Sequence, residues 1–191
     1  MIRITRVTSF VSGTPQFRIE EDMSARAPLY AFYTQSDLEG DLKGMASPNV
    51  ARKQVRTFDS VITASTGDVV FSLLSGTAAL VRAEHSGYLL TQNYVVLVPS
   101  RAIDASYLVY LLNENSDVRR QLRMGQQGSS TQKFSIRQLR ALELPALPSH
   151  EKQKLIGGLY LSQIRLHALR KRASDLETAL VLEAIREADH S

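Results

Sequence analysis

The residues best suited to chemistry lie in one polar stretch, Gly125–Lys133 (GQQGSSTQK). It contains three glutamines, two serines, a threonine and a lysine, and its two glycines allow the backbone to approach a ligand closely. A glutamine amide can contact N6 and N7 of adenine together, whereas hydroxyl groups and lysine bind phosphates. The composition therefore favours contact with nucleic acid. The alternative is a flexible loop in solvent that binds nothing.

Two segments rich in lysine and arginine support the first interpretation. Residues 119–140 include six basic residues and no acid, and residues 43–56 include four basic residues and no acid. The net charge of the whole chain is only +4, with a pI near 9.5, so the other charges nearly cancel. Such clusters are typical of a surface that binds a polyanion, although two ordinary solvated faces would have the same composition.

We therefore predict two groups of DNA-binding residues. Arginines in these groups suit O6 and N7 of guanine, as the glutamines suit adenine. The first group is Arg119, Arg120, Arg123, Gln126, Gln127, Ser129, Ser130, Thr131, Gln132, Lys133 and Arg137. The second group, from the other basic segment, is Lys43, Arg52 and Lys53.

The sequence contains no familiar catalytic or metal-binding motif. The four histidines, at positions 85, 150, 167 and 190, have no spacing typical of a metal site, and the chain has no cysteine. It has neither a phosphate-binding G-x-x-x-x-G-K loop nor a G-x-S-x-G nucleophile turn. We expect a protein that is not itself an enzyme, with no catalytic residue, bound metal or cofactor. An unfamiliar nuclease or methyltransferase site is the disfavoured alternative.

The elements that must position these residues predict a body rich in β-structure. Hydrophobic patterning and turn residues predict strands, in chain order, at 27–33, 56–63, 67–72, 75–81, 94–98 and 142–144, of which 67–72 and 75–81 form a hairpin. Helices are expected at 105–112, at 117–124, and after the S-x-x-Q capping box at Ser135–Gln138. Residues 36–42 predict a polar turn with three acids, Asp37, Glu39 and Asp41. We expect a mixed, β-rich α+β domain over residues 1–148.

The last part of the chain, residues 149–191, predicts a long helical arm. Ser149 suits an N-cap and the helix is expected from Glu151 to Arg186, roughly 54 Å long. Apolar and small residues recur at steps of four and three, as in a heptad repeat, at Leu155, Leu159, Ser162, Leu166, Leu169, Ala173, Leu176 and Leu180. Gly157 and Gly158 indicate either a bend or the close approach of another helix.

This repeat predicts pairing with a second helix. It continues for nearly four heptads and is flanked by charged residues, as at the edges of a coiled coil: Arg170, Lys171, Arg172, Asp175, Glu177, Glu183 and Glu187. The alternative is a terminal helix folded back onto its own domain. We predict dimerisation through the repeat, at Leu155, Leu159, Leu166, Leu169, Ala173, Leu176 and Leu180.

Length and hydropathy indicate one ordinary domain with an appendage. The chain has 191 residues and no apolar run near the 18 that a membrane helix needs. Its first residues do not begin a signal peptide. We therefore expect a cytoplasmic protein without a membrane partner.

The order of motifs resembles the specificity subunit of type I restriction-modification systems. The most specific match is the closing stretch Gly125–Tyr160, which ends with a leucine- and proline-rich strand and an E-x-Q start to a long helix at Glu151–Gln153. Individually weaker matches precede it in the same order: SGTP at 12–15, YAFYTQSDLEGDL at 30–42, GDVVFSLLSGTAALV at 67–81, TQNYVVLVP at 91–99 and SYLVYLLN at 106–113. The resemblance extends over nearly the whole chain.

This resemblance implies a target recognition domain that binds DNA bases and a helix that sets geometry. The partners it implies are double-stranded DNA, modification subunits that methylate adenine with S-adenosylmethionine, and a restriction subunit; the specificity chain itself is not catalytic. Members usually have two recognition domains joined by two antiparallel helices, whereas this chain has one domain and one arm, as in a half-length form. Two copies with antiparallel arms would restore that layout and recognise a bipartite site. The alternative function is a coiled-coil scaffold that binds proteins without sequence-specific DNA binding.

Overall fold

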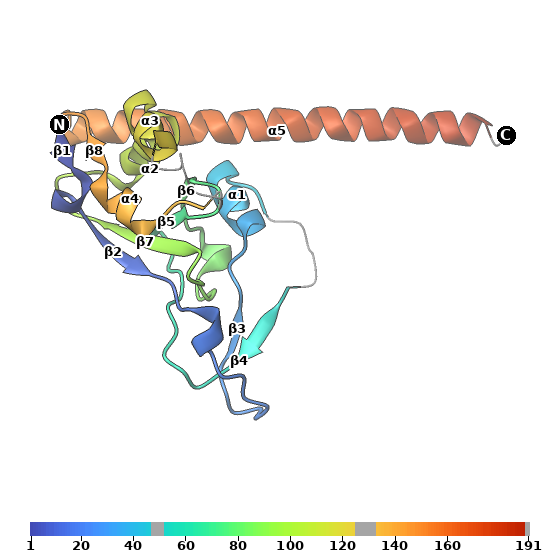
Figure 1. The fold of residues 1–191 in the computed structure, drawn as a ribbon. Coiled ribbons are helices and arrows are strands. Elements are labelled where there is room, and N and C mark those ends of the chain that lie inside the picture. The colour runs from blue at the N-terminus through green and yellow to red at the C-terminus, as the bar shows by residue number, and fades with distance from the viewer. Residues whose placement is uncertain (47–51, 125–132, 190–191) are drawn as a thin grey trace.

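The computed structural model describes residues 1–46, 52–124 and 133–189. Figure 1 shows a body that lies against one half of a long straight helix, α5 (His150–Asp189), while the other half of the helix projects beyond it. At 40 residues, α5 is about 60 Å long. The predicted α+β body followed by a long C-terminal helix is confirmed.

A four-stranded antiparallel sheet forms the centre of the body. Its strand order is β2 (Thr8–Ser12), β7 (Tyr94–Pro99), β5 (Val69–Ser72) and β6 (Ala78–Leu80). All four residues of β5 are buried, because β5 lies between two strands and its faces are covered. The predicted hairpin is confirmed in β5 and β6, where Val70 pairs with Ala79.

Two smaller antiparallel pairs extend the body. One joins β1 (Ile2–Arg3) to β8 (Glu143–Leu144), and the other joins β3 (Leu29–Ala31) to β4 (Gln54–Arg56). In Figure 1 the second pair lies far from α5, beyond the sheet. Three short 3-10 helices complete the connections: η1 (Ile4–Arg6), η2 (Gln16–Arg18) and η3 (Ala83–His85).

Helices α2 (Ala105–Glu114) and α3 (Ser116–Met124) begin near where the sequence predicts them. Asp104 caps α2 by accepting hydrogen bonds from the backbone N–H groups of Ser106 and Tyr107, at 2.9 and 3.1 Å. Helix α4 (Ile136–Ala141) begins with the predicted capping box between Ser135 and Gln138. Buried leucines of α2, namely Leu108, Leu111 and Leu112, belong to the largest hydrophobic core cluster.

The predicted polar turn at residues 36–42 is wrong, because this segment forms helix α1 (Gln35–Lys43). Thr34 and Asp37 form a reciprocal capping box at its start, and Gly44 ends it in the left-handed conformation at φ 62°. Two of its three acids, Asp37 and Asp41, are buried, whereas Glu39 is exposed. Charged side chains in a short segment suggested solvent, but their partners come from elsewhere in the chain.

The predicted strand at 27–33 is shorter than expected, because β3 covers only Leu29–Ala31. The predicted strand at 56–63 is wrong except at Arg56, since β4 covers Gln54–Arg56. In the β3–β4 register Leu29 lies opposite Arg56, so the next pair would join Pro28 to Thr57. Pro28 accepts a hydrogen bond from the Thr57 N–H at 3.1 Å but has no N–H to return one. The ladder therefore ends at this pair.

The first half of α5 is fastened to α2 and to the loop before it. Gln153 is buried; its side-chain oxygen accepts from the Asp104 N–H at 2.9 Å, and its amide donates to the carbonyls of Ala102 and Pro148 at 3.2 and 2.9 Å. One turn later Gly157 is also buried, and a Cβ at this position would lie 2.5 Å from backbone atoms of Ser106 and Tyr107. Of the two predicted meanings of the glycine pair, close approach of another helix is therefore confirmed at Gly157.

The predicted heptad face of α5 points away from the body. Leu166 lies about 180° around the helix from Gly157, at 100° per residue. The six leucines of the repeat are 41–72% exposed, so the chain's own body does not cover them. Within the described residues, no helix is both long and apolar enough to span a membrane.

Candidate nucleic-acid interface

The segments on either side of residues 125–132 are both anchored on the turn of the β5–β6 hairpin. On the α3 side, the Arg119 guanidinium donates to the carbonyl of Gly76 at 2.6 Å. On the other side, the N–H of Phe134 donates to the Leu73 carbonyl at 2.8 Å, and its ring lies edge-on to Phe71. The Phe134 ring also occupies the space that a Cβ at Gly76 would need. Hence Lys133 is held beside a rigid part of the sheet.

The predicted cations of this first group differ in how they are held. Arg119 is hydrogen-bonded to the Gly76 carbonyl, and Arg120 forms an ion pair with Asp117 at 2.8 Å on the surface. Arg123, Lys133 and Arg137 are exposed and form no ion pair with another described residue, so they are available to a ligand. The predicted contacts Gln126, Gln127, Ser129, Ser130, Thr131 and Gln132 lie outside the described residues.

The second predicted group is engaged largely with the protein itself. Lys43 pairs with Glu39 at 2.9 Å on the same helix. Arg52 bonds to Asp37 at 2.7 Å and lies over the ring of Tyr88, 5.0 Å from its centroid. Lys53 is exposed, with its Nζ 5.3 Å from the centre of the Phe32 ring.

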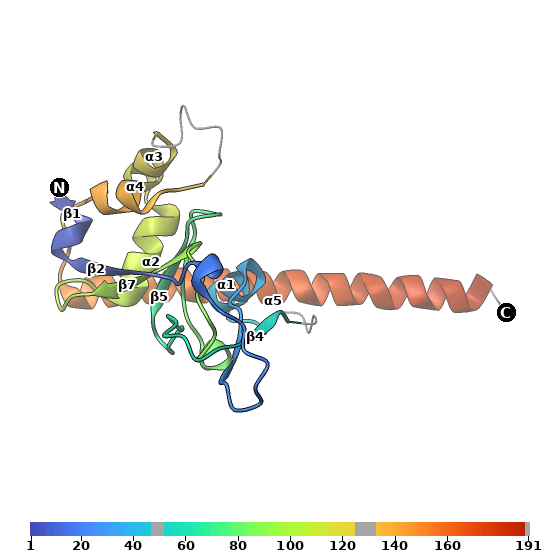
Figure 2. The same ribbon diagram turned by 60° about the horizontal axis from the view of Figure 1, so that its bottom comes forward.

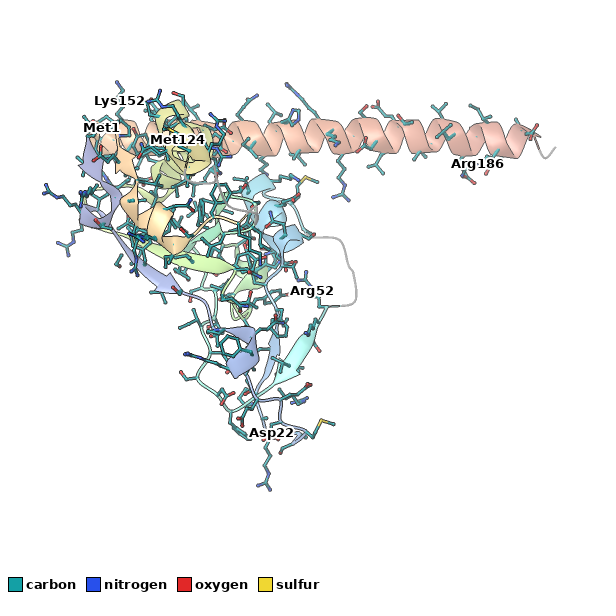
Figure 3. The ribbon with its side chains drawn as sticks, in the orientation of Figure 1. Met1, Asp22, Arg52, Met124, Lys152 and Arg186 are labelled. Atoms are coloured by element: carbon teal, nitrogen blue, oxygen red, sulfur yellow. The ribbon has the colours of Figure 1, made fainter. Side chains whose placement is uncertain are left out.

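The fold does not bring the two groups together. Met124, at the end of α3, and Arg52, before β4, lie well apart in Figure 3. Figure 2 likewise places α3 and α4 at one end of the body and β4 toward the other. The basic segments thus contribute to two separate surfaces.

A buried ionic cluster behind Arg52 is the feature that the sequence patterns missed. His85, from η3, lies between two acids of α1, Asp37 and Asp41: its Nδ1 is 2.7 Å from Asp41 and its Nε2 is 3.2 Å from Asp37. Each ring nitrogen therefore faces one of the two carboxyl groups. Asp37 also pairs with Arg52, at 2.7 Å.

Further hydrogen bonds complete the cluster and shift the pKa values of two of its members, Asp37 and Tyr33. Burial opposes ionisation of Asp37, but hydrogen bonds from Thr34 and Arg52 outweigh it, so the pKa of Asp37 lies below its usual value. The Tyr33 hydroxyl donates to Asp41 at 2.7 Å, and burial together with that carboxylate raises the pKa of Tyr33. The cluster therefore joins α1, η3 and the segment just before β4 as a structural ion network.

One local signal for this cluster was present in the sequence. Thr34-x-x-Asp37 matches a capping box, and on a helix Asp37 and Asp41 share one face at i,i+4 spacing. Nothing local connects them to His85, which is 44 residues from Asp41. In the described ranges no group of three or more histidine and acidic side chains is arranged to hold a metal.

We expect Asp37→Asn to lower the free energy of unfolding by about 2 kcal/mol at pH 7, since charge-assisted hydrogen bonds are lost. The lowered pKa means that this contribution is present above the ordinary value of 3.8 and is lost as pH falls through the folded value. The difference between the two proteins should therefore shrink as the pH is lowered below 3.8. Urea unfolding across pH measures both effects.

The matched control is Glu39→Gln on the same helix. Glu39 pairs with Lys43 on the surface, where an ion pair contributes less than about 0.5 kcal/mol. Equal stability of Asp37→Asn and wild type, or a difference that does not change with pH, would contradict the assigned role of the cluster.

The fold is similar to that of known specificity subunits. The HsdS subunit from Thermoanaerobacter tengcongensis aligns with 90% of this chain at a TM-score of 0.58 and 18% identity. A chain from a structure of complex assembly in a type I R-M system aligns with 98% at 0.61 and 18%. The type I restriction-modification S subunit from M. genitalium aligns with 92% at 0.51 and 15%.

The chain spans only 39–43% of the length of these three proteins. No family model and no curated protein matches its sequence. The alignments with these three structures confirm the resemblance predicted from the motifs at the level of the fold, which includes both the body and the long helix.

Proposed function

We propose that this chain is the DNA-recognition subunit of a type I restriction-modification complex and is not itself catalytic. The observation that carries the proposal is the fold: a single body and a single long helix align over at least 90% of the chain with three structures from such systems. Those proteins are more than twice as long as this chain. The similarity therefore supports DNA recognition by this chain, and we propose its part in the full activity of the complex.

In this proposal two copies pair through the exposed face of α5. Each copy supplies one body, and the pair presents two identical bodies to one duplex. A bipartite target with two-fold symmetry then follows from the symmetry of the protein. The division into a recognition domain at 1–148 and a dimerisation arm at 149–191 is part of the same proposal.

The proposed partners are double-stranded DNA and the modification and restriction subunits. The chemistry of methylation and cleavage would reside in those subunits, and this chain would determine where they act. A cytoplasmic location is the one compatible with access to the host chromosome. The second group of cations, in which Lys53 is exposed, is a candidate for additional contacts with the phosphate backbone of the DNA.

Mapping of methylated bases in host DNA, with and without this gene, tests the proposed function directly. We expect methylation at one interrupted palindromic sequence to disappear when the gene is removed. Unchanged methylation in a strain whose modification subunit is expressed would overturn the proposal. A continuous or asymmetric target would overturn the two-copy arrangement but leave DNA recognition in place.

We predict that Lys133→Ala weakens DNA binding to all sequences and lowers the salt slope of log K by about 1, because one phosphate contact is lost. Gln132→Ala should instead relax base preference. Fluorescence anisotropy with the modification subunits present, at several salt concentrations, measures both. As a control, Lys154→Ala removes the same charge from an exposed position on α5, and it should change neither the salt slope nor the base preference. If Lys133→Ala and Gln132→Ala also change neither, this segment does not bind DNA.

The exposed leucine face also suits the alternative, a scaffold that binds proteins and not a specific DNA sequence. The same anisotropy series discriminates the two functions. A recognition subunit should show a sequence-dependent binding constant whose logarithm falls linearly with log salt concentration. Sequence-blind binding in the presence of the modification subunits would favour the scaffold.

A further inference from the structure

The exposed apolar face of α5 has a pattern that reads the same from either end. Its positions, at alternating steps of four and three, are Leu155, Leu159, Ser162, Leu166, Leu169, Ala173, Leu176 and Leu180. The two small residues are the third from each end, and every other position is leucine. One step before Leu155 the pattern places Lys152, and one step after Leu180 it places Glu183.

Resting on the proposed function, we infer that α5 pairs antiparallel with α5 of a second copy in one particular register. In this register Leu166 faces Leu169 of the other copy, and Leu159 faces Leu176. The remaining layers join Leu155 with Leu180, Ser162 with Ala173, and Lys152 with Glu183. Leucine thus always meets leucine, small meets small, and the end residues have opposite charge.

Other arrangements of the same two helices lose this match. A shift by one heptad in one direction places Lys152 against Leu176, and a shift in the other direction places Glu183 against Leu159. A parallel pair keeps the leucine layers but puts Lys152 against Lys152 and Glu183 against Glu183. Like charges or a charge against leucine at such positions disfavour these alternatives.

The charge along α5 supports a second copy as the occupant. Residues 150–172 contain six lysines and arginines and one acid, whereas residues 173–189 contain five acids and one arginine. An antiparallel pair therefore brings the acidic end of each helix beside residues 150–164 of the other, which contain Lys152, Lys154 and one acid, Glu151. The cations at 165 and 170–172 lie near the centre of the pair, where they come close to the same cations of the other copy in both the parallel and the antiparallel arrangement. They therefore favour neither orientation.

The register also determines how far apart the two bodies lie. The two-fold axis crosses each helix between Leu166 and Leu169, and each body is fastened at Gln153 and Gly157. The two Gly157 positions are then 21 residues apart along the pair, about 32 Å. This axial offset is close to one turn of B-DNA, about 34 Å.

Disulfide trapping tests the register, and the natural chain has no cysteine to interfere. Leu159→Cys with Leu176→Cys should form a covalent dimer in a glutathione buffer, seen on a non-reducing gel. Two control pairs report the shifted registers: Leu159→Cys with Leu169→Cys, and Leu166→Cys with Leu176→Cys. Leu159→Cys alone reports a parallel pair. All three controls should cross-link at least tenfold less than the first variant.

Charge exchange provides a test that needs no cysteine. Lys152→Glu or Glu183→Lys alone should raise the dimer dissociation constant several-fold, and the two together should restore it. The results of these experiments distinguish failure of the register from failure of the two-copy arrangement. A monomer by sedimentation overturns both the register and the two-copy arrangement. A dimer that cross-links through a control pair overturns the register only, and DNA recognition is unaffected by either result.

Discussion

Leu166→Lys combined with Leu169→Lys should convert the proposed dimer into monomers. The two residues lie together at the proposed two-fold axis, so the pair of copies would contain four lysines where four leucines meet. Burial of a leucine contributes about 1.5–3 kcal/mol, and a buried lysine adds a desolvation cost. A loss of at least 4 kcal/mol corresponds to a dissociation constant raised by about 1000-fold or more. Analytical ultracentrifugation measures it.

The fold of the monomer should not change in this variant. Both leucines are exposed in the single chain, at 41% and 46%, so the circular dichroism and thermal stability of the monomer should be retained. Ser174→Lys with Thr178→Lys adds the same charge to exposed positions outside the leucine face and should leave the dimer intact. A Leu166, Leu169 variant that still sediments as the wild-type dimer would place the interface elsewhere.

The second large effect is expected at Gly157, where α5 meets α2. An alanine Cβ would lie 2.5 Å from the Ser106 carbonyl carbon and the Tyr107 nitrogen, and backbone atoms cannot move aside as a flexible side chain can. We expect Gly157→Ala to lower the free energy of unfolding by about 3 kcal/mol through overpacking. It should also loosen the attachment of the arm, because Gln153 alone would fasten it to the loop before α2.

The adjacent glycine supplies the matched control. A Cβ added at Gly158 would have no neighbouring atom within 4 Å, so Gly158→Ala should raise stability by about 1 kcal/mol through helix propensity. The same substitution at neighbouring positions is thus expected to change the free energy of unfolding in opposite directions. Thermal unfolding of both variants measures the difference, and equal effects would show that contact with α2 does not explain the glycine.

The local patterns of this chain were sufficient for most of its elements. The Asp104 and Ser135 caps, the β5–β6 hairpin and the buried strand Tyr94–Pro99 each depend on residues a few positions apart, so short windows contain their cause. The same holds for the long arm, whose heptad repeat and lack of proline are sufficient to predict a helix. The proposed DNA-binding residues remain a prediction from composition, and most of the first group lies outside the described residues.

The structure decided what depends on contacts between distant segments. His85 stands alone in the sequence, yet the fold places it between Asp37 and Asp41, so charges that suggested a solvated turn became a buried network. Gly157 could have meant a bend, and only the position of α2 shows a close approach. The sequence determined that α5 has an apolar leucine face. The face that the body covers was decided by two contacts: Gln153 bonds to the loop before α2, and Gly157 packs against α2. This leaves the leucines exposed for a partner.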